Sequence, residues 1–226
     1  MPTQEIRIAR GGSKSLMDAH SVIPEGEGPF PGVVVIHEIF GMNDNIRRIA
    51  ARFAEEGYAA IAVDLFSTGG RALCMMRLMY GMLVKPLKNG VVSDLGTAIE
   101  YFKLLPEVDG DRIGVVGFCM GGAYALQLAC TNHGMKAASV FYGMNPRPID
   151  AIANSCPVVG SYPQGDITEN SGSKLLRALE KHNIPHDMKV YENSQHSFCN
   201  DDMQAFNPDA CKDAWKRMVD FFGEYV

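Results

Sequence analysis

The pentapeptide G-F-C-M-G at residues 117–121 constrains this chain more than any other stretch, because it places a cysteine two residues from a glycine on either side. The apolar run at 113–116 precedes it and predicts a buried strand. The small, apolar residues at 122–129 follow it and predict a buried helix. A strand that turns sharply into a helix at G-x-S-x-G, here with cysteine in the serine position, is a nucleophile elbow.

Cys119 is the residue that such a turn would lift above the sheet. The glycines keep Cβ atoms out of the crowded corner, and the positive end of the following helix lowers the pKa of the thiol. The alternative is a buried structural cysteine in an ordinary strand–helix turn, since free cysteines are often buried. Two glycines would pack poorly there without a tight turn, which favours the nucleophile.

Strands and helices are expected to alternate along the chain, because runs of apolar residues and apolar residues at helical spacing follow one another. The expected strands are 5–9, 16–23, 32–37, 58–63, 113–116, 136–142, 158–162 and 186–191, the first two antiparallel. The expected helices are 44–56, 71–83, 93–105 with Ser93 as N-cap, 122–129, 171–182 and 209–225. This order predicts an α/β fold with a mostly parallel central sheet and helices on both faces.

Length and composition exclude several classes of protein. The 226 residues predict a single domain over 1–226 with no lid domain. A net charge of −5 without a basic stripe predicts no nucleic-acid and no membrane partner, and no apolar run is long enough to span a bilayer. The charged start does not resemble a secretory signal. We therefore expect a cytoplasmic monomer or weak homodimer whose six cysteines are free thiols without metal-binding spacing.

A cysteine nucleophile needs a general base and a carboxylate that orients this base. On sheets with a nucleophile elbow these groups follow in the order nucleophile, acid, histidine, each on a loop at the carboxyl end of a strand. Asp166 follows the strand expected at 158–162, and His196 follows the strand expected at 186–191. The sequence therefore predicts a triad of Cys119, His196 and Asp166 that needs no metal and no organic cofactor.

The loop after the strand at 32–37 is expected to complete an oxyanion hole. Its backbone N–H donor is expected at Ile39, and the second donor is the N–H of Met120 behind the nucleophile. Glu38 is unexpected in this loop, because a carboxylate beside a thiol disfavours the thiolate. It could instead accept the proton of the thiol, and a solvated loop glutamate is the alternative.

The cysteine elbow, H-E-I-F-G in this loop, and G-D and H-S-F further on together resemble the dienelactone hydrolase family over nearly the whole chain. The resemblance implies an α/β-hydrolase fold and hydrolysis of a small ester or lactone by the triad. It also implies that Glu38 partners the resting thiol and shifts when an anionic substrate binds. Phe40 and Ser197, which lie within the matched motifs, are expected to contact the substrate.

One departure from the family concerns arginines that bind the substrate carboxylate. None follows H-S-F here, where the chain reads C-N-D-D. Arg71 and Arg77 could match the other family arginine, or be solvated helix charges. Two other functions stay open. A thioesterase or other acyl hydrolase would use the same triad, and a non-hydrolytic protein would bind a small ligand or sense oxidants through Cys119.

Overall fold

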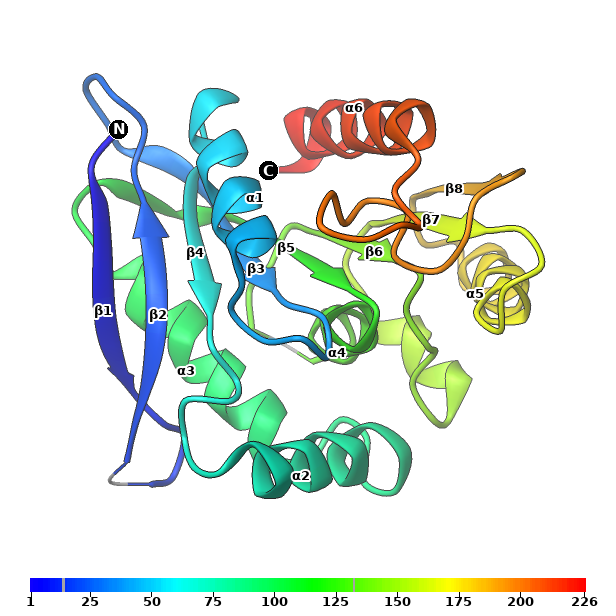
Figure 1. Ribbon diagram of the computed structural model, residues 1–226, viewed down its shortest axis with the longest axis horizontal. Helices are drawn as coiled ribbons and strands as arrows, with labels where there is room; N and C mark the ends of the chain where they lie inside the picture. The colour runs from blue at the N-terminus through cyan, green and yellow to red at the C-terminus, as the bar shows by residue number, and fades with distance from the viewer. Residues whose placement is uncertain (14, 132) are drawn as a thin grey trace.

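The computed structural model describes residues 1–13, 15–131 and 133–226, in which one eight-stranded sheet carries helices on both faces (Figure 1). The strands are β1 (Thr3–Ala9), β2 (Leu16–Val22), β3 (Phe30–Ile36), β4 (Ala59–Val63), β5 (Val108–Phe118), β6 (Ala137–Phe141), β7 (Val158–Pro163) and β8 (His186–Tyr191). The helices are α1 (Asp44–Glu55), α2 (Arg71–Leu83), α3 (Gly90–Lys103), α4 (Met120–Ala129), the 3-10 helix η1 (Ile149–Asn154), α5 (Glu169–Lys181) and α6 (Pro208–Tyr225).

The strand order across the sheet is β1-β2-β4-β3-β5-β6-β7-β8. The pairs β1–β2 and β2–β4 are antiparallel, and every pair from β4 to β8 is parallel. The carboxyl ends of β3, β5, β6, β7 and β8 therefore meet at one edge of the sheet. The loops that carry Glu38, Cys119, Asp166 and His196 lie at this edge.

Apolar side chains alternate between the two faces of the sheet, as β3 illustrates. Val33 and Val35 pack with α1 and α6 on one face, whereas Val34 and Ile36 pack with α2, α3 and α4 on the other. α5 joins α4 in a third cluster at the β7–β8 end (Figure 1). Among the described residues, no helix combines the length and apolarity needed to cross a membrane.

The expected order of strands and helices is confirmed, but several bounds differ. β5 spans Val108–Phe118 instead of 113–116, α4 begins at Met120 instead of 122, and α5 begins at Glu169 instead of 171. The largest shift of a helix start is at α3. α3 begins at Gly90, and its N-cap is Asn89 instead of Ser93. The Asn89 side chain accepts hydrogen bonds from the backbone N–H groups of Val91 and Val92, at 2.9 and 3.1 Å. Asparagine is as good an N-cap as serine, so the helix can begin at this earlier residue.

The turn between β5 and α4 has the geometry of a nucleophile elbow. Cys119 adopts φ 55° and ψ −115°, a backbone conformation that side chains rarely tolerate. A Cβ on Gly117 would lie 2.0 Å from the carbonyl oxygen of Gly121, and a Cβ on Gly121 would lie 2.2 Å from the carbonyl oxygen of Ile36. Both glycines are therefore required by the close approach of three backbone segments.

Candidate active site

Cys119 stands at the carboxyl edge of the sheet, between β5 and α4. Its backbone N–H donates to the carbonyl oxygen of Phe141 at 3.0 Å, which ties the elbow to the end of β6. The residue is partly exposed, unlike the buried Cys74 and Cys130. The strained corner thus presents the sulfur instead of packing it into the core.

His196 and Asp166 come together at the same edge. His196 Nδ1 lies 2.9 Å from Asp166 Oδ2, and this oxygen also accepts from the backbone N–H and the hydroxyl of Thr168. Burial works against ionisation of Asp166, but the hydrogen bonds from Thr168 and His196 outweigh it and lower the pKa of the carboxyl. The imidazole therefore has an ionised partner that fixes its orientation.

The thiol of Cys119 is protonated at rest, so the expectation of a pKa lowered by the end of the following helix is wrong. Burial and then the charge of Glu38 raise its pKa to about 11, and the charge of Asp166 adds to this effect. The backbone N–H groups of Met120 and Ile39 act in the opposite direction by hydrogen bonding. The two N–H groups expected in the oxyanion hole therefore lie near enough to the sulfur to influence its pKa.

Glu38 is buried and firmly held. Only 3% of it is exposed, and its carboxylate accepts from Ser197 Oγ at 2.6 Å and from Asn200 Nδ2. Ser197 adopts a positive φ of 65°, which turns its hydroxyl toward this carboxylate. A solvated loop glutamate is thereby ruled out. Ser197, which is expected to contact the substrate, donates to Glu38 in this structure, and its substrate contact stays a prediction.

His37 holds the oxyanion loop in place by hydrogen bonds. Its ring is fully buried, with Nδ1 donating to the carbonyl oxygen of Glu38 at 2.6 Å and Nε2 accepting from the N–H of Leu65 at 3.0 Å. Burial lowers the pKa of His37, so the ring is neutral. A neutral ring satisfies both contacts, since one nitrogen donates and the other accepts.

The two candidate arginines have different surroundings. Arg71 donates to the carbonyl oxygens of Ile39 (3.0 Å) and Phe40 (3.3 Å), so it lies beside the oxyanion loop. Arg77 pairs with Asp94, which is 1% exposed. The structure places Arg71 beside the oxyanion loop and pairs Arg77 with Asp94, and a substrate contact from either arginine stays a prediction.

Tyr142 and Asn200 belong to the site but were not selected from the sequence. The Tyr142 ring lies 4.9 Å from that of His196, and its buried hydroxyl has no hydrogen-bond partner in the described part of the chain. Burial, followed by the charge of Glu38, raises the pKa of this hydroxyl well above its usual value. Its place at the end of the strand expected at 136–142 was the available signal, since that strand neighbours the elbow strand.

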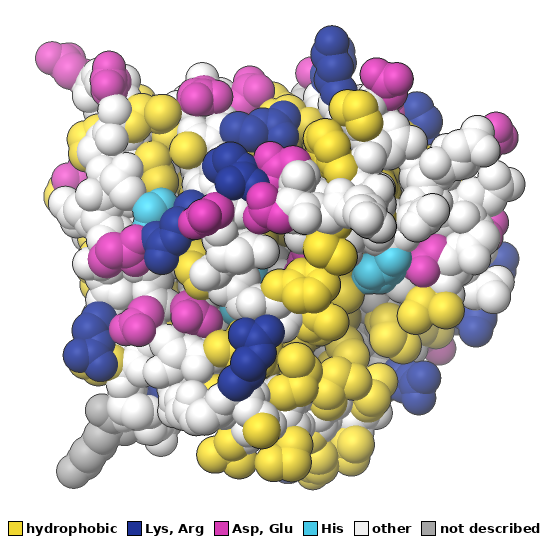
Figure 2. Space-filling view, in the orientation of Figure 1, with side chains coloured by type: hydrophobic (Ala, Val, Ile, Leu, Met, Phe, Trp, Pro, Cys, Tyr) yellow, Lys and Arg dark blue, Asp and Glu magenta, His cyan; other side chains and the backbone are white. Residues whose placement is uncertain are grey.

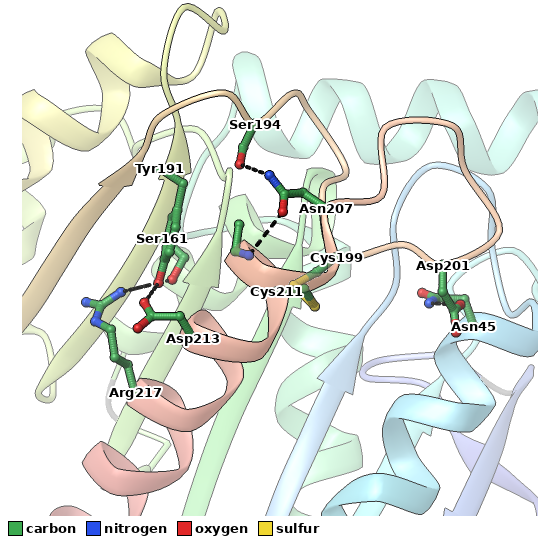
Figure 3. Close-up of a disulfide and its surroundings, with 11 residues drawn as sticks. Asn45, Ser161, Tyr191, Ser194, Cys199, Asp201, Asn207, Cys211, Asp213 and Arg217 are labelled. Carbon is green, nitrogen blue, oxygen red and sulfur yellow. Dashed lines mark hydrogen bonds between the residues drawn. A yellow bond between two sulfur atoms is a disulfide. The ribbon is translucent and has the colours of Figure 1, made fainter.

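A disulfide joins Cys199 to Cys211, so the expectation of six free thiols is wrong for these two (Figure 3). Cys199 lies three residues after His196, and Cys211 lies in the first turn of α6. Asn207, the N-cap of α6, also donates to Ser194 Oγ at 3.1 Å. The loop that carries His196 is thus tied to α6 covalently and by hydrogen bonds.

Apolar side chains gather beside the site. Figure 2 shows that hydrophobic side chains, in yellow, cover the lower part of the face in view, with a histidine at the upper edge of this area. The exposed apolar residues of α2 and of the oxyanion loop are Ile39, Phe40, Leu73, Met76, Met79, Tyr80 and Leu83. The described residues contain no cluster of three or more side chains placed to hold a metal ion.

Comparisons with known proteins point to one family. The model of the "Dienelactone hydrolase family" matches residues 17–226. A "Putative carboxymethylenebutenolidase" of Saccharolobus solfataricus is 32% identical over 86% of this chain and 90% of its own length. One of the same name from Methylorubrum extorquens is 29% identical over 93% and 77%. The crystal structure of a "Putative Dienelactone Hydrolase" from Klebsiella pneumoniae has a TM-score of 0.85, 27% identity and complete coverage of both chains.

Proposed function

The chain belongs to the dienelactone hydrolase family, has the α/β-hydrolase fold and is a hydrolase, and we propose that it cleaves a small ester or lactone through Cys119. The observation that supports this proposal most strongly is the position of the Cys119 sulfur. It lies at the strained turn between β5 and α4, near the N–H groups of Ile39 and Met120. Asp166 and His196, hydrogen-bonded at the same sheet edge, supply the proton-transfer pair.

In the proposed reaction the sulfur of Cys119 attacks the carbonyl carbon and a tetrahedral oxyanion forms. The N–H groups of Ile39 and Met120 stabilise this charge, a contribution of about 3 kcal/mol for each well-placed donor. The proton that the thiol loses is passed to the leaving alkoxide by way of His196. His196 then removes a proton from the water that hydrolyses the thioester and returns it to the departing sulfur. Asp166 keeps the ring oriented and stabilises the imidazolium.

The resting thiol must lose its proton before it attacks. The negative charge of Glu38 lies close enough to the sulfur to oppose this loss. Ser197 and Asn200 hold the two carboxylate oxygens of Glu38 by hydrogen bonds. A shift of Glu38 toward the thiol would require breaking these two hydrogen bonds. The proposal is that substrate binding drives this shift, so the nucleophile is generated only when an acyl group is in place.

The raised pKa of Cys119 also argues against the oxidant-sensing alternative. An oxidant sensor needs an exposed thiolate, and burial together with Glu38 raises this pKa to about 11. A thioesterase or other acyl hydrolase would place the same charges in its transition state, so the triad alone does not select the acyl group. Ester or lactone hydrolysis agrees with the family.

The test is hydrolysis of p-nitrophenyl acetate by Cys119→Ala. We expect loss of activity to the background rate, with an unchanged circular dichroism spectrum. Cys156→Ala is the matched control, because Cys156 is also a free cysteine of intermediate exposure but lies away from the sheet edge. Full activity in Cys119→Ala would refute the proposal.

A further inference from the structure

A cavity of about 620 Å³ lies between the segment after β6 and helix α5. Asn145, Arg147 and Asp150 line one side, and Lys174 and Arg177 line the other. η1, in the first of these segments, packs against α5 (Figure 1). The volume is within the range of small-molecule sites, which is about 300–1,000 Å³. None of the proposed triad residues lines this cavity.

The cavity concentrates positive charge on a protein whose net charge is −5. Its lining includes four Lys or Arg side chains and a single acid, Asp150. Lys181 pairs with this acid at 2.7 Å. Arg147, Lys174 and Arg177 form no ion pair with any of the described residues. Lys174 and Arg177 are one helical turn apart and face the cavity together, so three unneutralised cations surround it.

Asn145 provides a second feature that does not depend on charge. Its Nδ2 donates to the backbone carbonyl oxygen of Ser171 at 2.8 Å, which fixes the orientation of the amide. Its Oδ1 is buried and has no hydrogen-bond partner in the described part of the chain. A buried acceptor without a donor is unfavourable, and most such groups in proteins find a partner. A ligand hydroxyl in the cavity would supply the missing hydrogen.

We propose that this cavity binds a small polyanion that also carries a hydroxyl group, as hydroxylated polycarboxylates and phosphate esters do. Arg147, Lys174 and Arg177 neutralise the anionic oxygens, whose binding relieves the mutual repulsion of the three cations. The hydroxyl donates to Asn145 Oδ1. The site is separate from ester hydrolysis and needs no covalent step.

Calorimetric titration of the full-length protein with citrate tests the proposal. Tricarballylate has the same three carboxylates but lacks the hydroxyl, and we expect it to bind about fivefold more weakly, since one hydrogen bond to a buried acceptor is lost. Glycerol 3-phosphate presents a phosphate together with hydroxyls, and its titration shows whether phosphate or carboxylate is preferred. Citrate binding should weaken with added salt, because exposed charges are screened.

Variants identify the site. Each of Arg147→Gln, Lys174→Gln and Arg177→Gln should weaken citrate binding about 3-fold, the scale of one exposed charge contact, and the triple variant about 30-fold. Lys212→Gln is the matched control, since Lys212 is an exposed lysine of α6 outside the cavity. Unchanged melting temperatures would confirm that the variants fold.

Three outcomes would overturn the proposal: no binding of citrate or glycerol 3-phosphate, equal binding of citrate and tricarballylate, or an equal loss in Lys212→Gln. Because Cys119→Ala is expected to bind citrate normally, a failure of the proposed hydrolase function would leave these results unaffected.

Discussion

Replacing Glu38 by glutamine should make the thiol of Cys119 more reactive toward an alkylating reagent. Only the thiolate reacts, and a pKa of about 11 leaves about one molecule in a thousand ionised at pH 8, since each pH unit changes the ratio tenfold. The charge of Glu38 is the second cause of this high pKa, after burial. Glutamine removes the charge but leaves the burial unchanged.

The size of the effect follows from the strength of a neighbouring charge. A charged group within a few ångströms moves a pKa by about 1 to 3. Because burial is the larger cause here, we take the lower limit, which predicts a rise of about tenfold in the alkylation rate of Cys119 at pH 8. The midpoint of the rate profile should also move to lower pH, while staying above the ordinary value for cysteine, near 8.5.

The assay is alkylation by iodoacetamide between pH 7 and 11, followed by mass spectrometry of the peptide that contains Cys119. Glu27→Gln is the control, because Glu27 is an exposed glutamate in the loop between β2 and β3. A wild-type midpoint near 8.5 would refute the assignment of a protonated resting thiol. An unchanged rate in Glu38→Gln would refute the role given to the Glu38 charge.

Three further predictions concern the triad, the disulfide and His37. Asp166→Asn should lower kcat/KM for p-nitrophenyl acetate by about 10³ or more, because the amide no longer stabilises an imidazolium; a loss below tenfold would contradict the triad. Reduction by dithiothreitol should lower the free energy of unfolding by about 3 kcal/mol in urea titrations, since the Cys199–Cys211 bond closes a loop of 12 residues, and the double serine variant should show no such response. Folding lowers the pKa of His37. The contribution of its neutral ring to stability is therefore complete above the pKa of the unfolded state, near 6.5, and is lost as the pH falls below that value. The urea midpoint should fall less between pH 7.5 and 5 in His37→Gln than in the wild type.

Much of the fold follows from local sequence patterns. The continuous apolar strands β3 to β6 can be recognised because both faces of a parallel sheet are buried. The elbow was also predictable, since only glycine fits at 117 and 121, where added Cβ atoms would lie within 2.2 Å of backbone oxygens. These features depend on residues close together in the chain.

Features that depend on distant residues were not predictable in the same way. Glu38 could be recognised as unusual, but its partners Ser197 and Asn200 lie about 160 residues away, and the sequence cannot show which donors reach it. Arg77 looked equivalent to Arg71 on one helix, yet the two point to different neighbours because Asp94 on α3 is buried and requires cations. Competition among side chains from separate elements decides such assignments.

The oxyanion loop shows why these distant contacts matter for the proposed chemistry. His37 and Arg71 hold the carbonyl oxygens of Glu38, Ile39 and Phe40, so the peptide groups of this loop are fixed from both sides. Fixed carbonyls also fix the N–H groups of the same peptides, including the Ile39 donor, and a preorganised donor needs no reorientation when charge develops. His37 holds the peptide that carries the Ile39 N–H, whereas Arg71 holds the next two carbonyls and so fixes the chain that follows this donor. Arg71 therefore supports the proposed reaction as a brace for the loop, and its contact with a substrate carboxylate stays a prediction.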